Sequence, residues 1–218
     1  MKPKTPFTQP FDKLPKKLPL YTLENALLPG GQLPLELSEA NDLAMFLDTL
    51  KTDQLIGMVQ PQGTGDSIYQ TGCAGRIRQY RERSDGRLNI MLTGLCRYKI
   101  IEELAPKNGY RVARVDWSGF EHDYDTENVD NQIIENFRIV LRSYFERHNM
   151  QVDWQALDKL HIENVVNNLV LILNLSIDNK QQLLESPTLK QRLELFAELL
   201  EEKSDPIVVT ATASKLVN

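Results

Sequence analysis

The chain is poor in the residues that build disulfides and metal sites. Its 218 residues include two cysteines, Cys73 and Cys96, and three histidines that are scattered along the sequence, His122, His148 and His161. A chain of this length buries about 70–75% of its unfolded surface, so it folds without a disulfide or a metal. Each cysteine lies in strand-like sequence, which predicts small, reduced packing residues in a reducing compartment. We therefore predict no metal site and no cofactor.

An excess of positive charge and a long apolar run are also absent. The net charge is −5 and the sequence pI is about 5.3, which disfavours nucleic acid as a partner. The longest apolar run is Leu169–Leu173, whereas a membrane helix needs about 20 such residues. The first residues contain lysine and proline but no apolar core of a signal peptide. These absences predict a cytoplasmic protein that does not contact a membrane.

Motifs of catalysis are missing as well. No Gly-x-x-x-x-Gly-Lys sequence is present to hold the phosphates of a nucleotide, and no Gly-x-Ser-x-Gly sequence is present to hold a nucleophilic serine. The pair Ser214-Lys215 lies in a weakly specified tail rather than on a rigid element. Residues 161–163, His-Ile-Glu, offer one histidine where a metalloprotease helix has two. We predict that the chain is not an enzyme.

Hydrophobic patterning predicts an α+β protein in which a β-rich region precedes a helical one. The predicted segments are a flexible basic N-terminal segment (1–17), a β-rich pseudo-barrel subdomain (18–118), an acidic connector (119–128), a helical bundle subdomain (129–203) and a C-terminal tail (204–218).

Within the β-rich region, many short strands with regular turns predict a closed or nearly closed barrel. After an alternating apolar run at 33–37, the strands are expected at 55–59, 69–83, 88–93, 97–104 and 110–117. Asp85-Gly86 predicts a tight hairpin turn, because glycine reaches positive φ without strain. One helix interrupts the strands, with Ser38 as its expected N-cap.

In the helical region, apolar residues recur at helical spacing in several stretches. Helices are expected over 129–145, 157–175 and 178–185, and a last helix is expected to begin at Ser186-Pro187, with proline in its first position.

An ordered set of short motifs then points to a family. The set comprises Pro29-Gly30, Gly72 followed by Ile77, Asp85-Gly86-Arg87, Gly94 followed by Arg97-Tyr98-Lys99-Ile100, and the run 176–185. Together they resemble the N-terminal substrate-binding domain of Lon-type ATP-dependent proteases, over about residues 18–203. One departure is the run 37–41, Leu-Ser-Glu-Ala-Asn, where the family commonly has a Phe-Glu-Pro-Arg-Tyr-like segment.

The resemblance implies a six-stranded pseudo-barrel similar to PUA-like domains, followed by a helical bundle. It also implies a role in selecting unfolded or tagged protein substrates, since ATP hydrolysis and cleavage belong to other domains of Lon proteases. We expect a stand-alone form that lacks the ATPase and peptidase domains. The predicted function is a non-enzymatic protein- or peptide-binding module, acting as a substrate adaptor with a protease as a further partner.

Candidate contact residues follow from the side chains that protein surfaces use. Arg97, Tyr98 and Trp117 are the predicted peptide contacts, because tyrosine and tryptophan combine apolar area with a polar group and arginine adds directional donors. The opposing interpretation is barrel packing with Arg97 in a structural ion pair. The run 76–83 contains four arginines beside Tyr80, so RNA binding through a PUA-like surface is the alternative function.

Overall fold

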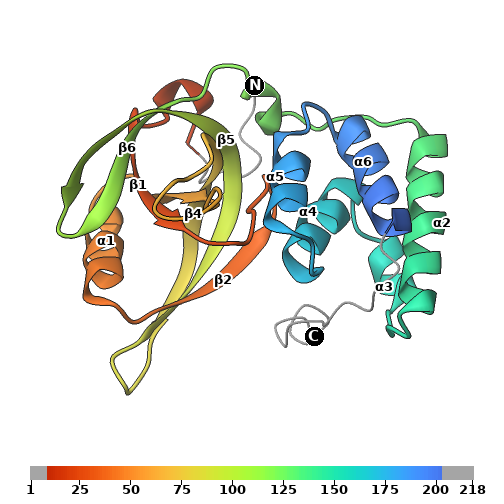
Figure 1. The fold of residues 1–218 in the computed structure, drawn as a ribbon, viewed down its shortest axis with the longest axis horizontal. Helices are drawn as coiled ribbons and strands as arrows, with labels where there is room; N and C mark the ends of the chain where they lie inside the picture. The colour runs from red at the N-terminus through yellow and green to blue at the C-terminus, as the bar shows by residue number, and fades with distance from the viewer. Residues whose placement is uncertain (1–8, 203–218) are drawn as a thin grey trace. The chain divides into compact units, whose positions relative to one another are not determined.

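A computed structural model of the chain describes residues 9–202 and contains two compact units, Met1–Thr126 and Glu127–Asn218 (Figure 1). The predicted tail at 204–218, which includes Ser214-Lys215, lies outside the described residues, as does the start of the predicted N-terminal segment. Within that segment, Phe11–Lys13 form a 3-10 turn, η1, and Leu14 is buried.

Unit 1 is built on six strands whose pairings close on themselves. Their bounds are β1 (Lys17–Thr22), β2 (Gln32–Leu37), β3 (Leu55–Val59), β4 (Thr71–Glu82), β5 (Leu88–Lys107) and β6 (Tyr110–Asp116). The order of hydrogen-bonded strands is β5-β4-β3-β1-β6, and β6 pairs with β5 again, which closes the ring. Strand β2 pairs with β5 outside this ring. Among these six strands of the described chain, β1 and β3 pair in parallel and the other pairings are antiparallel. The α+β fold with a barrel-like sheet is therefore confirmed.

One strand is much longer than expected. The sequence predicts separate strands at 88–93 and 97–104, whereas β5 is continuous over Leu88–Lys107. The glycine at the predicted break is paired, because the Gly94 N–H donates to the Gly31 carbonyl over 2.9 Å and the Gly30 N–H donates to the Gly94 carbonyl over 2.8 Å. The register against β4 shifts beside Gly94, so the strand bends there without ending. This length lets β5 pair with β2, β4 and β6.

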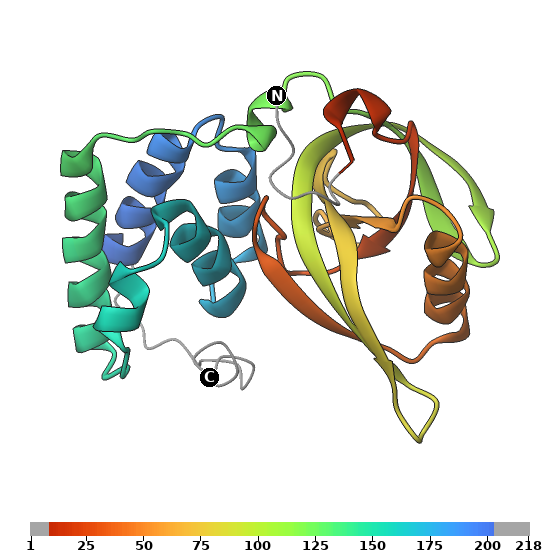
Figure 2. The ribbon, with the colours of Figure 1, turned by 180° about the vertical axis from the view of Figure 1, so that it is seen from behind.

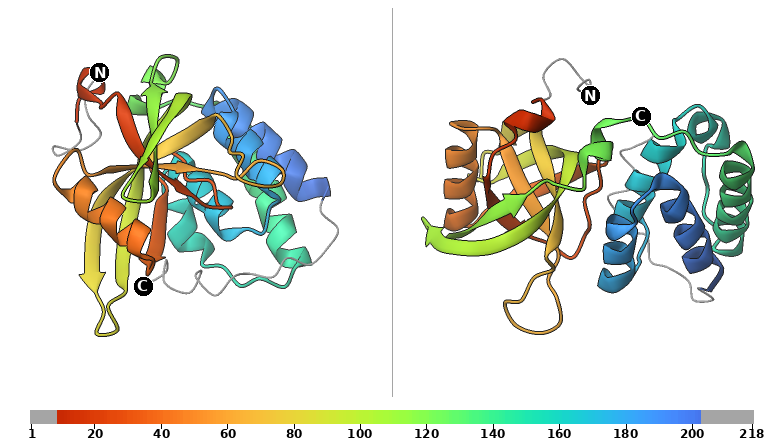
Figure 3. Two further views of the ribbon diagram at one scale, coloured as in Figure 1. Left: turned by 60° about the vertical axis from the view of Figure 1, so that its left-hand side comes forward. Right: turned by 90° about the horizontal axis from the view of Figure 1, so that it is seen from above.

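Helix α1 (Ala40–Leu50) lies beside the sheet in Figure 3. Met45 and Phe46 are buried, and the Asp48 carboxylate accepts a hydrogen bond from the Tyr110 hydroxyl of β6 over 2.9 Å. The prediction that Ser38 caps the helix is wrong: Glu39 stands at the N-cap and makes no side-chain cap bond. Strand β2 continues to Leu37, which leaves Ser38 in the connection.

Unit 2 consists of five helices within the described part of the chain (Figure 2). They are α2 (Asn131–Arg147), α3 (Trp154–Asp158), α4 (Ile162–Ile172), α5 (Ile177–Glu185) and α6 (Leu189–Glu202). The region predicted as one helix at 157–175 is two, because His161 is extended (φ −62°, ψ 134°) and stands at the N-cap of α4. Pro187 precedes α6 by two residues and is not its first position.

Candidate protein-binding site

Arg97, the first predicted contact residue, lies in a buried ion pair. Its Nη2 is 2.7 Å from Oδ1 of Asp123, its Nε donates to both carboxylate oxygens over 3.1 Å, and its backbone N–H donates to Oδ2 over 2.8 Å. The Arg97 side chain is 3% exposed and stacks over the Phe120 ring at 5.1 Å. Burial opposes its charge, but the bonds with Asp123 outweigh burial and raise the pKa of Arg97 above its ordinary value. The pair fastens the 3-10 turn η2 (Glu121–Tyr124) to β5.

Tyr98 and Trp117 lie inside the barrel with their rings in edge contact, 5.8 Å between centroids. Tyr98 is fully buried and its hydroxyl donates to the Met58 carbonyl over 3.2 Å. Trp117 is 8% exposed and its Nε1–H donates to the Pro15 carbonyl over 2.9 Å. Each of the three residues therefore has a packing role in the barrel, and their contact with a peptide stays a prediction.

A free sheet edge lies on β4, in the hairpin that projects beyond the rest of unit 1 in Figure 2. On the side of β4 that pairs with β3, the last backbone hydrogen bond runs from the Ile77 N–H to the carbonyl of Gln54, the residue before β3, over 3.0 Å. From Gln79 to Glu82, β4 pairs only with β5 among the described residues. Residues 78–87 are all exposed. This stretch of β4 is thus an open edge for another strand.

The antiparallel register fixes which backbone groups face the open edge. The Arg83 N–H donates to the Arg87 carbonyl over 2.8 Å, so this is a hydrogen-bonded pair. Along an antiparallel pair of strands, opposed residues alternate between hydrogen-bonded and non-hydrogen-bonded pairs. The pairs Glu82–Leu88 and Tyr80–Ile90 are therefore non-hydrogen-bonded. The backbone N–H and C=O groups of Tyr80 and Glu82 therefore point away from β5.

An exposed aromatic side chain lies on this edge and contacts helix α1. Tyr80 is 58% exposed, and its ring makes an edge contact with Phe46 of α1 at 5.3 Å between centroids. Leu47, the next residue of α1, is 54% exposed. Large apolar side chains beside unpaired backbone groups are the combination that an extended peptide requires. The sequence run 76–83 drew attention to Tyr80, whereas Leu47 belongs to the apolar repeat of α1 and its exposure was not predicted.

The arginines around the edge differ in their partners. Arg83 and Arg87 both bind Glu36 of β2, at 3.0 and 2.6 Å. Both also lie near Asp85 of the hairpin turn, at 3.6 and 3.0 Å, so two carboxylates compensate their charge. Arg78 and Arg81 are exposed and have no side-chain partner within residues 9–202. Burial, and then the charge of Arg78, lower the pKa of Arg76. A peptide at this edge therefore meets a modest positive charge.

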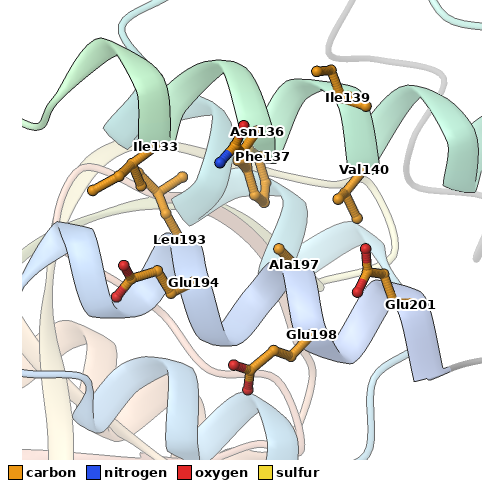
Figure 4. Close-up of a pocket in the computed structure, with 10 residues that line it drawn as sticks. All are labelled: Ile133, Asn136, Phe137, Ile139, Val140, Leu193, Glu194, Ala197, Glu198 and Glu201. Atoms are coloured by element: carbon orange, nitrogen blue, oxygen red, sulfur yellow. The ribbon is translucent and has the colours of Figure 1, made fainter.

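A second surface lies between α2 and α6 in unit 2 (Figure 4). It is a hollow of about 420 Å³, which we call the α2–α6 groove. Its lining residues are Ile133, Asn136, Phe137, Ile139, Val140, Leu193, Glu194, Ala197, Glu198 and Glu201. Figure 4 shows Ile133 and Leu193 at one end, and Val140 and Glu201 at the other, so the two helices run in the same direction. No pattern in the sequence pointed to this groove.

Groups for metal or redox chemistry do not gather within residues 9–202. No set of three or more His, Cys, Asp or Glu side chains is placed to hold a metal there. Both cysteines are free and buried, and burial raises the pKa of the Cys96 thiol well above its ordinary value. No helix in the same range is long and apolar enough to cross a membrane.

Comparison with known proteins places the chain beside the Lon proteases. Residues 17–202 match the family model of the ATP-dependent protease La (LON) substrate-binding domain. Lon protease 2 of Myxococcus xanthus is 27% identical over 209 residues, covering 89% of this chain and 24% of that protein. Lon protease of Anaeromyxobacter dehalogenans is 26% identical with the same coverage. The chain thus spans about a quarter of the length of these curated relatives.

Solved structures show the same fold. A Lon N-terminal domain protein from Xanthomonas campestris superimposes with a TM-score of 0.63 at 24% identity, covering 85% of this chain and 98% of that one. The N-terminal domain of Lon protease from the Mycobacterium avium complex gives a TM-score of 0.63 at 16% identity, covering 86% and 99%. The fold predicted from the motifs is the fold of these domains.

Proposed function

Because the chain belongs to the substrate-binding domain family of the ATP-dependent protease La, we propose that it is a protein-binding module without catalytic activity of its own. In this proposal it binds exposed, extended segments of unfolded or tagged proteins and acts as an adaptor that presents them to a protease. The observation that carries the proposal is the open β4 edge with the exposed ring of Tyr80 on it.

The geometry supports binding by strand addition. An extended segment would exchange backbone hydrogen bonds with Tyr80 and Glu82, and one of its side chains would contact the exposed ring of Tyr80. Backbone bonds do not depend on sequence, which suits a module that binds many unfolded chains. Arg78 and Arg81 would favour segments with acidic residues.

Arg97, Tyr98 and Trp117 are the contact residues that the sequence predicts, and Arg97 and Tyr98 pair with the end of β4 that is remote from the open edge. All three are buried, and direct contact with a peptide would require part of the barrel wall to open. Replacing Trp117 with phenylalanine tests the contact role that the sequence predicts. If Trp117 touches the peptide, the affinity falls while the unfolding midpoint changes little; if it only packs, stability falls and affinity at low temperature is unchanged.

The decisive experiment uses proline to remove one donor from the open edge. The Glu82 N–H faces away from β5, so Glu82→Pro removes it without breaking a ladder bond, as proline tolerates on edges. We expect Glu82→Pro to weaken binding of a fluorescently labelled, reduced and carboxymethylated protein at least tenfold by anisotropy. Glu82→Ala keeps the donor and is the matched control, so it should bind like the parent chain.

Two further measurements separate the proposal from its rivals. Casein incubated with the chain and ATP should stay intact, and mixed RNA at low salt should not displace the unfolded probe. Equal affinities for the Glu82→Pro and Glu82→Ala variants would overturn the edge model. Displacement of the probe by RNA would favour the alternative function instead.

A further inference from the structure

The α2–α6 groove has an apolar interior. Phe137 and Leu193 are buried in it, and Ile133, Val140 and Ala197 are partly exposed along it. In Figure 4 the Ala197 methyl group points toward α2 across the hollow. A volume of about 420 Å³ lies within the range of ligand-binding pockets. The hollow is thus large enough to receive several apolar side chains of a partner.

One wall of the groove is acidic and the other is not. On α6, Glu194, Glu198 and Glu201 are exposed and follow one another at spacings of four and three residues. Residues seven apart on a helix lie on the same face, about 10 Å from each other. The α2 wall offers Asn136 and Ile139 instead. A partner would therefore meet negative charge along one side only.

These carboxylates are mostly uncompensated. Lys190 lies 3.8 Å from Glu194, but both side chains are about half exposed, and such pairs contribute little. Glu198 and Glu201 have no side-chain partner in the part of the chain that the structure describes. The stretch 127–202 carries 13 acidic and 7 basic side chains, a net charge of −6. Its field adds to the local charge and attracts cationic partners.

The backbone decides the conformation of such a partner. The groove is lined by two α-helices whose N–H and C=O groups are used within the helices, so it offers side chains and no free ladder of backbone groups. An extended peptide would bury unpaired backbone groups there, which costs free energy. A helix satisfies its own backbone and presents an apolar stripe. This is the opposite of the requirement at the β4 edge.

From these observations we infer that the α2–α6 groove is a second docking site, which binds an amphipathic helix with basic residues. The apolar stripe of the helix enters the hollow, and lysine or arginine side chains spaced seven residues apart pair with Glu194 and Glu201. Such a segment belongs to a partner protein, which this surface identifies by its chemistry as a basic amphipathic helix. The inference goes beyond the proposed function, because it assigns a separate surface and a different chemistry.

The test uses two synthetic peptides of about 15 residues, the length at which isolated helices begin to form. One has a leucine stripe flanked by lysines, and the other has the same sequence with every lysine replaced by glutamate. We expect the lysine peptide to bind the full chain by anisotropy, gain helical circular dichroism on binding, and lose affinity as salt is raised. The glutamate peptide should bind at least tenfold more weakly.

Two variants locate the binding. Ala197→Phe fills the hollow with an apolar side chain at a partly exposed position, so it should weaken binding of the lysine peptide at least tenfold. Glu194→Gln combined with Glu201→Gln should weaken it about tenfold. The control is Glu24→Gln combined with Glu39→Gln, which removes the same two charges from exposed positions of unit 1 and should leave affinity unchanged.

Several results would overturn the inference. Equal affinities for the two peptides would show that charge does not contribute to binding. Unchanged affinity in the Ala197→Phe variant would show that the peptide binds outside the groove. Glu82→Pro should not change the affinity for the lysine peptide. The strand-addition model is therefore tested by Glu82→Pro, and this inference is tested by the groove variants. Circular dichroism of each variant before titration verifies that the helices are intact.

Discussion

Each unit of the chain buries one arginine, and each arginine joins elements of its own unit. In unit 1, Arg97 binds the carboxylate of Asp123 and joins β5 to η2. In unit 2, Arg192 is 3% exposed, donates from Nε to the Leu183 carbonyl over 3.0 Å, and donates from Nη1 to the Asn167 side chain over 3.1 Å. In both units a buried cation thus joins segments that are distant in the sequence.

The two units differ in their charge and in the surfaces that they present. Residues 1–126 carry 16 acidic and 16 basic side chains, whereas residues 127–202 carry a net charge of −6. The neutral unit presents unpaired backbone groups at the β4 edge, and the acidic unit presents side chains in a groove between helices. An extended segment and an amphipathic helix thus find complementary sites on one chain.

The largest expected effect comes from removing the carboxylate in unit 1. Asp123→Ala leaves the Arg97 guanidinium buried without its counter-charge, and breaking a buried pair in this way costs about 3–5 kcal/mol. The free energy of unfolding, measured by urea denaturation with circular dichroism, should fall by this amount. Arg97→Met combined with Asp123→Leu removes both charges and should recover most of the loss. A loss below about 1 kcal/mol for Asp123→Ala would contradict the anchoring role of the pair.

A smaller effect is expected where glycine makes room for Tyr98. A Cβ added at Gly57 would lie 2.7 Å from the Tyr98 hydroxyl oxygen and 2.8 Å from Cδ2 of Leu20. Overpacking of this kind costs about 1–3 kcal/mol. Gly57→Ala should therefore lower the free energy of unfolding by about that amount in urea denaturation.

The double variant identifies the cause of this loss. Tyr98→Phe removes the hydroxyl, so in its background Gly57→Ala should cost about 1 kcal/mol less than it does alone. No coupling between the two substitutions would assign the loss to Leu20 or to the backbone. Unit 2 offers no such pair, since none of its residues is a glycine.

The sequence predicted the parts of the fold that depend on local pattern and on ordered motifs. Motifs that can be read directly in the sequence indicate the Asp85-Gly86 turn, the fold class and the family. The continuity of β5 could not be predicted, because Gly94 looks like a break until its partners at Gly30 and Gly31 are known. The split near His161 was also hidden, since apolar residues continue at helical spacing across it.

The candidate sites were less predictable for a similar reason. Trp117 and Tyr98 are residue types that binding surfaces use, but burial depends on which strands close the barrel. The open edge of β4 exists because β3 is shorter than β4, which is a property of pairing rather than of residue type. The α2–α6 groove joins residues 133–140 to residues 193–201, and no local window contains both.

The smallest expected effect compares the N-termini of two helices. Ser176 caps α5, since its hydroxyl accepts from the Asn179 N–H over 3.2 Å, and loss of such a cap costs about 1 kcal/mol. Ser38 precedes α1 without capping it. In urea denaturation, Ser176→Ala should lower the free energy of unfolding by about 1 kcal/mol, while Ser38→Ala should change it by less than about 0.5 kcal/mol. Equal losses would mean that Ser38 stabilises α1 after all, and that capping does not distinguish the two units.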